Sequence, residues 1–317
     1  MNIAYRFRIY PTEEQKILLG KTFGCCRFLY NQMLNDKIRE YEKTKKMLKN
    51  TPAMYKKEYP FLKEIDSLAL ANVQLHLEKA YKNFFRDPKI GFPRFKSKHH
   101  SKNSYTTNVV NGNILVESKR IRLPKLKWIA MKKHREPAEG LRLKSVTVSM
   151  EPSGKYFASL LYEGYSCENQ AAGPDYSTAK ILGIDYAMQG MAVFSEKVET
   201  EEAGFFRKNE KRLAREQRKL SRCVRGSHNY ELQKKKVARC HEKIRNQRRD
   251  HLHKLSRKIA DGYDAAAVED IDMKAMGQCL HFGKSVQDNG YGMFREMLDY
   301  KLAWKGKKMV KVDRFFP

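Results

Sequence analysis

The sequence of 317 residues lacks the features of membrane and secreted proteins. No apolar run approaches the roughly 20 residues of a membrane-spanning helix, and the N-terminus has no signal-peptide core. The six cysteines include no Cys-x-x-Cys pair, so no zinc site is visible and the thiols are typical of a reduced cytosolic protein. There is no internal repeat or low-complexity tract. We therefore expect a cytoplasmic protein with no membrane partner.

Acidic residues are scarce relative to basic ones: 36 Asp and Glu stand against 64 Lys and Arg, a formal charge of +28. An excess of this size favours a polyanion as partner, nucleic acid first and an anionic membrane surface second. The imbalance is greatest between residues 207 and 258, where 20 cations accompany five acids. Apolar residues recur there at helical spacing on both sides of residues 225–229, which predicts a basic helical hairpin.

Two carboxylates follow apolar runs that are far apart in the sequence. Asp185 comes after a strand-type run at residues 181–184, and Gly183, Ala187 and Gly190 indicate a tight turn. Residues 191–194 then indicate a second strand, hence a hairpin. Glu269 comes after the apolar residues 265–268. If they meet at one sheet edge, these acids supply the hard oxygen ligands of a magnesium-dependent phosphodiester-cleaving site. The alternative is that Asp185 caps a turn and Glu269 caps the next helix.

The N-terminal region begins with a strand over residues 4–10, in which Arg6 and Arg8 share one face. Thr12 is a natural N-cap for the helix predicted over residues 15–49. These signals indicate a strand followed directly by a long helix.

A second helix is predicted over residues 67–85 from its apolar periodicity. Its polar side carries Asn72 and Lys82, and Asn is a side chain that reads adenine edges. A solvated polar face is the alternative for each of these residues. Residues 91–98 then interleave aromatic and cationic side chains where Gly and Pro forbid a helix, which suits base stacking and phosphate contact.

The stretch from about residue 104 to 165 is rich in short segments of β type, and strands are predicted at residues 104–107, 113–116, 120–123, 146–150 and 156–162. Turn signals at Asn111-Gly112 and Ser153-Gly154 are typical of hairpins. A first strand, a helical insertion and a return to short strands predict a small β-barrel interrupted by a helical lobe. Residues 167–178 have the composition of a linker. Near the end, residues 293–304 predict a helix and residues 308–312 a strand.

In their order these segments resemble the TnpB family, the transposon-encoded relatives of type V CRISPR effectors. The matching motifs span nearly the whole chain: Arg8-Ile-Tyr-Pro11, Cys26-Arg-Phe-Leu-Tyr-Asn31, Ala80-Tyr-Lys-Asn-Phe-Phe85, Gly91-Phe-Pro-Arg-Phe95, Gly183-Ile-Asp185, Asp250-x-Leu-His-Lys-Leu255, Val268-Glu-Asp270 and Val312-Asp-Arg-Phe-Phe-Pro317. The resemblance implies an α/β multi-domain fold, a β-barrel wedge with an inserted helical recognition lobe, followed by an RNase H-like RuvC domain. The expected boundaries are 1–14 and 97–178 for the wedge with its linker, 15–96 for the lobe and 179–317 for the RuvC-like domain.

The resemblance also implies an RNA-guided DNA endonuclease of RuvC type. Its expected partners are a guide RNA and a target double-stranded DNA with a short flanking motif, with one protein per guide RNA, in the prokaryotic cytosol and associated with the nucleoid. Asp185 and Glu269 match the first and second RuvC carboxylates, which makes them the expected catalytic residues and ligands of two Mg²⁺ ions. The residues expected to bind nucleic acid are Arg6, Arg8, Ser67, Asn72, Lys82, Arg94, Lys96, Lys98, Arg245, Arg248, Arg249, Lys254 and Arg257.

The sequence departs from the family pattern after its Phe-Phe-Pro motif. Family members continue into two Cys-x-x-Cys pairs of a zinc ribbon and a third RuvC carboxylate, whereas this sequence ends at Pro317. Of the nearest remaining acids, we expect Asp288 to be an N-cap and Asp313 a structural residue after a strand. With two acids the metal pair would lack ligands, so we expect weak or no cleavage by these 317 residues and no zinc site.

Two other functions stay open at this point. A cleavage-deficient, RNA-guided DNA-binding repressor would keep the basic hairpin and dispense with chemistry, although the presence of both Asp185 and Glu269 favours a nuclease. A DDE-type transposase shares the RNase H-like fold but needs three acids, and the wedge and recognition motifs count against it.

Overall fold

The computed structural model describes residues 2–164, 178–187, 191–200, 204–272 and 288–313. The chain divides into two compact units, Met1–Tyr165 and Ser166–Pro317, and each has its own hydrophobic core. Apart from Thr178, the predicted linker at residues 167–178 lies outside the described residues.

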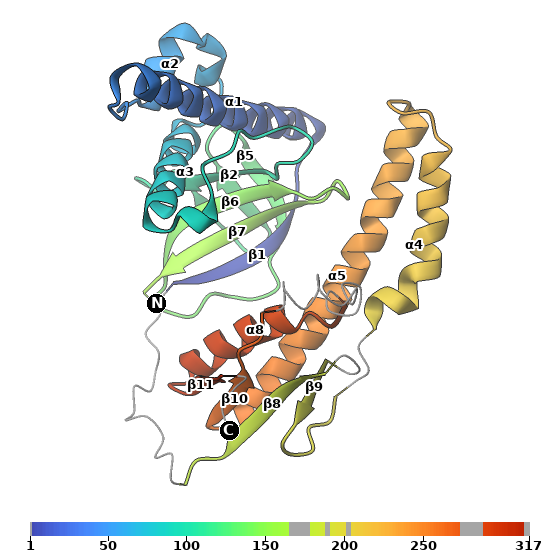
Figure 1. Cartoon of the computed structure of the whole chain (residues 1–317). Coiled ribbons are helices and arrows are strands. Elements are labelled where there is room, and N and C mark those ends of the chain that lie inside the picture. The colour runs from blue at the N-terminus through green and yellow to red at the C-terminus, as the bar shows by residue number, and fades with distance from the viewer. Residues whose placement is uncertain (1, 165–177, 188–190, 201–203, 273–287, 314–317) are drawn as a thin grey trace. The chain divides into compact units, whose positions relative to one another are not determined.

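Seven antiparallel strands form the sheet of the first unit (Figure 1). They are β1 (Ile3–Tyr10), β2 (Asn103–Asn108), β3 (Leu115–Val116), β4 (Arg120–Leu123), β5 (Lys127–Lys132), β6 (Arg142–Met150) and β7 (Tyr156–Glu163). The pairing order is β2-β6-β7-β1-β5-β4-β3, so β1 is the middle strand. The sheet is open where the sequence predicted a small barrel, because β2 and β3 are its two edges rather than partners.

Turn chemistry accounts for most of this meander. Asn111 and Gly112 have φ values of 48° and 69°, and Gly154 has a φ of 82°, as the two predicted turns require. Strand β5 was not predicted. The chain enters it through Lys125 and Lys127, whose φ values of 64° and 58° are uncommon for lysine, so the sequence carries no turn signal there.

The helices of the first unit begin at side-chain caps. Thr12 and Gln15 form a capping box at α1 (Glu13–Thr44), with bonds of 3.3 and 3.0 Å. This helix ends well before residue 49, the predicted end, because Lys45 adopts a left-handed conformation with φ 58°. It is followed by α2 (Pro52–Glu58), η1 (Pro60–Lys63), α3 (Ser67–Arg86) and η2 (Pro88–Ile90).

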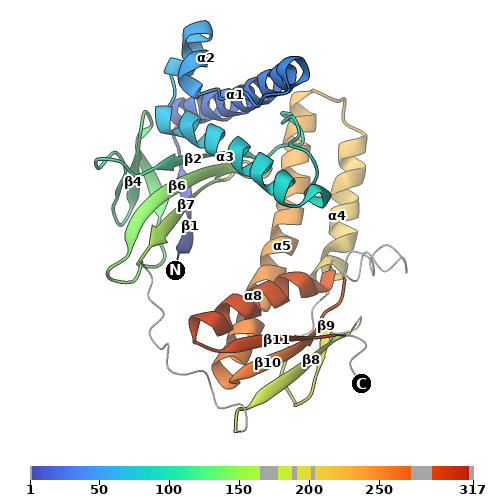
Figure 2. The ribbon, with the colours of Figure 1, turned by 60° about the vertical axis from the view of Figure 1, so that its left-hand side comes forward.

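These helices share one core with the sheet. Phe7 of β1, Leu19 of α1, Leu77 of α3 and Leu160 of β7 are all buried in it. Both α1 and α3 contact the edge strand β2 (Figure 2). The segment predicted as a helical lobe therefore packs directly on the strands, since the apolar faces of its helices are buried against them.

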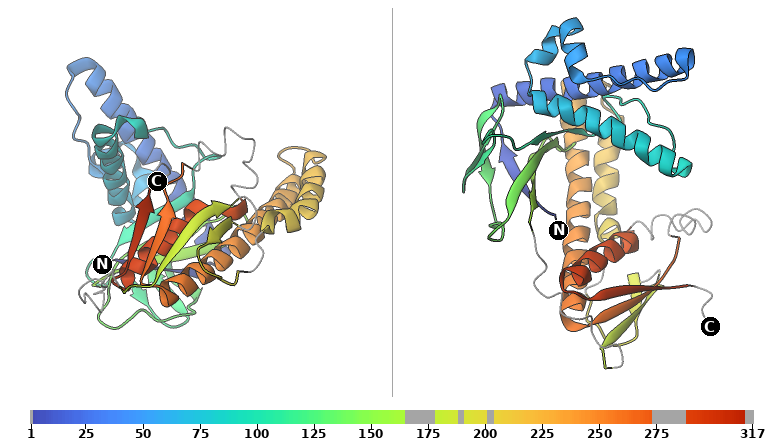
Figure 3. Two further views of the ribbon diagram at one scale, coloured as in Figure 1. Left: turned by 60° about the horizontal axis from the view of Figure 1, so that its bottom comes forward. Right: turned by 90° about the vertical axis from the view of Figure 1, so that its left-hand side faces the viewer.

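A four-stranded sheet organises the second unit. Its strands are β8 (Ile181–Ala187), β9 (Met191–Phe194), β10 (Ala265–Glu269) and β11 (Lys308–Val312), in the order β11-β10-β8-β9. The pairs β10–β11 and β8–β10 are parallel, and β9 is antiparallel to β8, as the predicted hairpin requires (Figure 3). The helices α5 (His228–Gly262) and α8 (Tyr291–Trp304) pack on this sheet through a common core.

The basic segment forms the predicted helical hairpin, in which α4 (Phe205–Ser221) pairs with α5. Ser227 caps α5 by accepting the N–H of Tyr230 at 3.1 Å. A small core of Leu213, Cys240 and Ile244 joins the two helices. Within the described ranges, no helix is long and apolar enough to cross a bilayer.

Candidate active site and nucleic-acid surfaces

The two predicted acids lie on neighbouring parallel strands. In the β8–β10 ladder, Ala267 is opposite Gly183 and Val268 is opposite Ile184, so Asp185 and Glu269 are the next residues of the two strands. Parallel strands bring their carboxyl ends to the same edge of a sheet. The sequence prediction that the two acids meet at one sheet edge is therefore met.

Strand alternation explains why Asp185 is exposed. Leu182 and Ile184 are buried in the core with α8, and Asp185 occupies the alternate position. The strand does not end at Asp185 as predicted but continues to Ala187, and Asp185 is opposite Val193 of β9. The alternative role as a turn cap does not fit this place inside a strand.

Gly183 also has a role different from the predicted one. It lies inside β8, where its N–H donates to Ser195 Oγ at 2.9 Å and its carbonyl accepts the Ser195 N–H at 3.0 Å. A Cβ at this position would lie 3.3 Å from Ser195 Cβ. The glycine thus allows close approach of the segment after β9, rather than a tight turn.

A tyrosine and an arginine of α8 adjoin the acids. Tyr291 is completely buried, and its hydroxyl has no hydrogen-bond partner among the described residues. Burial raises the pKa of its phenol to about 12; Arg295 opposes the rise, and the charges of Asp185 and Glu269 add to it. Arg295 Nη1 donates to the Glu269 carbonyl at 3.2 Å and lies 3.4 Å from Asp270 Oδ1. Sequence reasoning missed Tyr291 and Arg295 because only the packing of α8 brings them to β10.

The donor set at this edge fits a hard cation. Carboxylate oxygens are the ligands that Mg²⁺ takes from proteins, and Mg²⁺ keeps several waters and binds substrate phosphates in its other positions. Among the described residues, no cluster of three His, Cys, Asp or Glu side chains could hold an ion. Asp185 and Glu269 supply a pair of carboxylates that such an ion could use, and the buried Tyr291 hydroxyl is a further polar group nearby.

Asp288 is a structural acid. It is buried and accepts the N–H of Phe206 at 2.9 and 3.2 Å and the guanidinium of Arg248 at 3.0 Å. It therefore caps the N-terminus of α4, where the macrodipole favours a negative charge. The prediction that Asp288 is an N-cap is wrong for the helix that follows it, because Gly290 occupies the N-cap position of α8. The Asp288 carboxylate instead binds the first turn of α4 from a distant segment. Asp313 directly follows β11, as predicted.

Comparisons with known proteins identify the family of this chain. A family model described as "Probable transposase" (OrfB_IS605) matches residues 164–279, and one described as "Helix-turn-helix domain" matches residues 1–46. A "Putative RNA-guided DNA endonuclease" of Streptomyces pristinaespiralis is 32% identical over 326 residues, covering 99% of this chain and 78% of that protein. The "Putative RNA-guided DNA endonuclease InsQ" of Escherichia coli K12 is 30% identical, covering 98% of this chain and 80% of that protein. The chain belongs to the TnpB family of RNA-guided DNA endonucleases.

A solved structure has the same fold as this TnpB-family chain. The "Cryo-EM structure of the Cas12f1-sgRNA-target DNA complex" matches with a TM-score of 0.57 at 12% identity, covering 99% of this chain and 89% of the other. Over the residues matched by the helix-turn-helix model, the structure consists of β1 and the long helix α1.

The predicted nucleic-acid residues of β1 differ in their availability. Arg6 and Arg8 share a face, as expected for alternate residues of a strand. Arg6 is half-buried; it pairs with Glu151 at 2.6 Å and lies 4.0 Å over the Phe157 ring. Arg8 is exposed, with its guanidinium 4.9 Å over the Tyr10 ring. The sequence could not foresee the partner of Arg6, which comes from the β6–β7 turn.

The prediction that Asn72 lies on the exposed face of α3 is wrong. The residue is buried, and its side-chain amide donates to the Leu68 carbonyl at 2.9 Å. It lines a pocket of about 180 Å³ that also contains His76 and Lys96. Lys82 and Ser67 are exposed as predicted, and the Ser67 hydroxyl accepts from Lys56 at 3.0 Å.

The segment predicted at residues 91–98 is held against α1. Asn31 donates to the Lys96 carbonyl at 2.9 Å and accepts its N–H at 2.8 Å. Lys96 Nζ lies 3.8 Å over the Tyr30 ring, and burial lowers the pKa of this lysine. Arg94 and Lys98 are exposed. Of the three predicted cations here, Lys96 has a largely internal position.

The predicted cations of α5 are mostly in ion pairs. Arg248 holds the buried Asp288, so it is a structural residue. Lys254 pairs with Asp250 at 2.8 Å, and Arg257 pairs with Asp261 at 2.9 Å, both at the surface. Exposed pairs of this kind are worth little and can exchange for phosphate. Arg249 is exposed, and Arg245 is half-buried.

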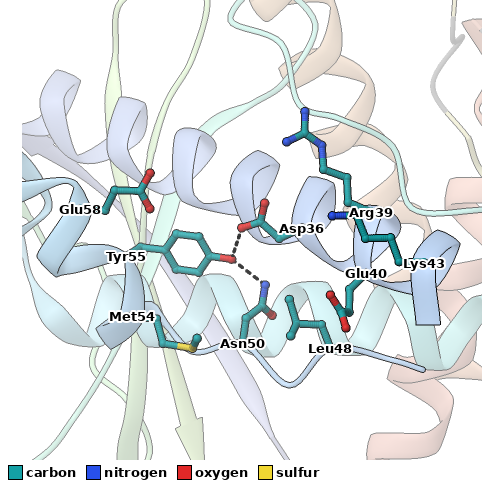
Figure 4. Close-up of a pocket in the computed structure, with 9 residues that line it drawn as sticks. All are labelled: Asp36, Arg39, Glu40, Lys43, Leu48, Asn50, Met54, Tyr55 and Glu58. Carbon is teal, nitrogen blue, oxygen red and sulfur yellow. Dashed lines mark hydrogen bonds between the residues drawn. The ribbon is translucent and has the colours of Figure 1, made fainter. Parts of the chain in front are cut away.

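A further pocket of about 350 Å³ lies between α1 and α2 (Figure 4). The Tyr55 hydroxyl donates to Asp36 at 2.6 Å and accepts from Asn50 at 2.7 Å. Three acids, Asp36, Glu40 and Glu58, line the pocket together with two cations, Arg39 and Lys43. Sequence reasoning missed it because helix packing, not spacing along the chain, assembles the lining.

Proposed function

We propose that this chain binds a guide RNA and its DNA target and cleaves the DNA at the Asp185–Glu269 edge with the help of Mg²⁺. The observation that carries the proposal is the register of β8 and β10, which sets the two acids side by side beside a buried phenol. The names of the two relatives, both RNA-guided DNA endonucleases, support the same activity.

The proposed partners are a guide RNA and double-stranded DNA with a short flanking motif, at one protein per guide. The net charge of +28 supports a polyanionic partner, and the solved Cas12f1 structure is a complex of that protein with an sgRNA and a target DNA. The exposed Arg8, Lys82, Arg94, Lys98 and Arg249 are available for phosphate contact. Ser67 is the exposed candidate for reading the flanking duplex, and Asn72 could do so only from inside its pocket.

In this proposal the first unit contains the recognition lobe, at residues 15–96, and the strands of the wedge. The wedge with its linker, at residues 1–14 and 97–178, extends past the boundary between the two units at residue 165. The second unit corresponds to the RuvC-like domain at residues 179–317. The parallel strands β8, β10 and β11 with α5 and α8 support this assignment, because a parallel sheet with acids at one edge is what an RNase H-like site requires.

The mechanism distributes roles over named side chains. Asp185 and Glu269 would hold the ion through their carboxylate oxygens. Bound magnesium would stabilise the charge on the scissile phosphate and activate a water. Arg295 keeps Glu269 in place through its carbonyl, and its charge would help to stabilise negative charge on a phosphate bound at this edge. The buried Tyr291 hydroxyl can donate a hydrogen bond to a carboxylate or a water at the edge.

A cleavage-deficient guided DNA-binding protein is the second candidate. One observation favours it: in the described ranges only two carboxylates meet at the site, and no three-residue metal cluster occurs. Binding through phosphate contacts does not require the acids.

One experiment separates the two functions. The purified protein is incubated with its guide RNA and a matching DNA, with and without Mg²⁺, and guided binding and cleavage are measured separately. We expect Asp185→Ala and Glu269→Gln to lose cleavage by about 100-fold or more and to keep guided binding. Glu199→Gln is the matched control, because its side chain is 87% exposed and pairs only at the surface with Lys258.

Three outcomes decide between the candidates. Cleavage that survives in both acid variants overturns the active-site assignment. Guided binding without cleavage in the unmodified protein selects the second candidate. Binding that does not depend on the guide RNA overturns both.

A further inference from the structure

An exposed aromatic cluster lies at the C-terminal end of α3, in the first unit. Tyr81, Phe84, Phe85 and Phe92 form it, and we call this group the aromatic platform. The Phe85 side chain is 66% exposed and Phe92 is 45% exposed, whereas Tyr81 is buried beneath them. An exposed group of large apolar rings marks an interaction surface.

The rings support one another. Phe92 meets Tyr81 and Phe84 edge-on, with centroids 5.5 and 5.4 Å apart and planes at 88° and 82°. Tyr81 and Phe85 are one helical turn apart, with centroids 6.1 Å apart and planes at 23°. Edge-to-face contacts of this kind fix ring orientation. Phe85 packs against this group through Tyr81 and through Phe84, whose ring centroid lies 5.4 Å away, so its ring is held in place while most of its side chain remains open to solvent.

The backbone around the platform is also held in place. The segment that carries Phe92 begins at Gly91, whose φ of 85° suits glycine, and is clamped further along by the two Asn31–Lys96 bonds of 2.9 and 2.8 Å. A ring on such a segment loses little freedom when a ligand binds. Preorganisation of this kind favours stacking over simple solvation.

Lysine and arginine side chains surround the aromatic platform. Residues 79–98 contain seven Lys and Arg and one acid, Asp87. The Asp87 carboxylate accepts the backbone N–H of Lys89 at 3.0 Å. Lys82, Arg86, Lys89 and Arg94 are exposed, and none forms an ion pair with another residue of the described part of the chain. An aromatic face ringed by uncommitted cations matches a nucleic-acid strand, whose bases stack while its phosphates contact cations.

We infer that the aromatic platform binds unpaired nucleotides, with Phe85 stacking on a base and the surrounding cations contacting the flanking phosphates. Paired bases cannot use this face, since their own neighbours occupy both sides of each ring in a duplex. This inference deepens the proposed function: it assigns the platform to a single-stranded stretch of the guide or of the opened target.

The test compares strands and variants of the full chain. Affinity is measured by fluorescence anisotropy for a short single-stranded DNA, an RNA of the same sequence, and the corresponding duplex, each at several salt concentrations. A base in the single strand is replaced by 2-aminopurine, whose fluorescence reports stacking. The variants are Phe85→Ala, Phe85→Trp and, as matched control, Phe61→Ala, another exposed aromatic residue in an aromatic cluster of the first unit.

We expect Phe85→Ala to weaken single-strand binding by at least about fivefold, the lower end of what one stacked base contributes. The slope of log affinity against log salt should not change, because no phosphate contact is lost. Phe85→Trp should keep both the affinity and the 2-aminopurine signal, and Phe61→Ala should change neither. The arm with the larger loss, DNA or RNA, identifies which strand uses the platform.

Three outcomes overturn the inference: an unchanged affinity for both single strands, an equal loss on the duplex, or an equal loss with Phe61→Ala. Guided binding is assayed in parallel with the unmodified protein. If guided binding fails while Phe85-dependent stacking persists, the proposed function is wrong but the inference that the aromatic platform binds unpaired nucleotides is supported. If guided binding is intact and Phe85→Ala has no effect on single strands, the platform alone is wrong.

Discussion

The two units use carboxylates at the ends of apolar segments in opposite ways. In the first unit, Asp66 follows Ile65, is buried, and accepts hydrogen bonds from the Leu68 N–H at 3.0 Å and from the Thr107 hydroxyl. In the second unit, Asp185 follows Ile184 and is exposed, and its carboxylate forms no hydrogen bond or ion pair with another residue of the described ranges. Both acids come after an apolar residue, but only Asp66 is saturated by internal partners.

Asp66 is the N-cap of helix α3, whereas Asp185 belongs to a strand, so sheet type bears on the second acid alone. The first sheet is antiparallel, so neighbouring strands end at opposite edges. In the second sheet three strands run parallel, so residues that follow β8, β10 and β11 come to one edge from distant parts of the sequence. That edge can gather acids for a shared ion, whereas an acid such as Asp66 serves its own helix.

The largest expected effect on stability concerns Asp288, an acid of the second unit that is buried rather than exposed. Asp288 is buried like Asp66, and Arg248 is its cationic partner. Arg248→Ala should lower the free energy of unfolding by about 3–5 kcal/mol, because a buried carboxylate is left without its cation. The chain has two tryptophans, Trp128 in the first unit and Trp304 in the second. Urea unfolding followed by Trp304 fluorescence in a Trp128→Phe background measures the effect on the second unit alone.

Arg249→Ala is the matched control one residue along α5. Its side chain is exposed, so stability should stay within about 0.5 kcal/mol. If Arg249 contacts a phosphate, the slope of log affinity against log salt should flatten by about 0.7–0.9. Equal stability losses in the two variants would contradict the distinction between structural and surface cations.

The next effect concerns Asp66 itself. Asp66→Ala should destabilise the first unit by about 2–3 kcal/mol, because α3 loses its cap and the completely buried Thr107 loses its partner. Trp128 fluorescence in a Trp304→Phe background reports this unit. Asp185→Ala, read through Trp304, should cost no more than about 0.5 kcal/mol. A large loss in Asp185→Ala would show that its carboxylate is structural too, and the comparison would fail.

The smallest expected effect is a pH dependence in the second unit. Lys301 is buried in α8 and donates to the His253 carbonyl at 2.6 Å and to Ser256 Oγ at 2.7 Å. Burial lowers the pKa of Lys301 to about 8. The positive charge of Arg257 lowers this pKa further, whereas the negative charge of Asp261 raises it. Between pH 8 and the ordinary value of 10.5 the unfolded chain binds more protons, so stability should rise with pH by about 2 kcal/mol.

The measurement for Lys301 is the difference between the unmodified chain and Lys301→Met, unfolded in urea at pH 7 and at pH 10. The increase in the free energy of unfolding between pH 7 and pH 10 should be present in the unmodified chain and absent in Lys301→Met. Other groups that titrate in this range, such as Tyr300 with its raised pKa, cancel in the difference. An equal change in the free energy of unfolding with pH in the two proteins would show that the ammonium group of Lys301 is hydrated in the folded state.

Much of the local structure could be predicted from short-range signals. Thr12 and Gln15 form the capping box, Asn111 and Gly112 the turn, and the helical hairpin breaks at residues 225–229 as the charge and periodicity indicated. Each of these depends on residues within one or two turns of each other. β5 was missed because the chain reaches it through lysines at positive φ, which no composition rule anticipates.

The roles of individual charged and polar residues could be predicted less well. Arg6, Asn72 and Arg248 were all predicted to face nucleic acid, yet each has an internal partner: Glu151, the Leu68 carbonyl and Asp288. Tyr291 and Arg295 were overlooked and lie beside the acids. Two of these partners, Glu151 and Asp288, come from distant segments, so neither spacing nor charge density could identify them.

By itself the sequence determined the excess of positive charge, the start and type of most elements, and the presence of Asp185 and Glu269 at or near strand ends. Those properties depend on composition and on contacts between residues close in the chain. Only the tertiary structure decided that the two acids are neighbours, that Asn72 is buried, and that Phe85 is held against Tyr81 with most of its side chain exposed. Strand register and helix packing set these distances, because the burial of distant apolar faces against each other fixes which polar groups remain exposed.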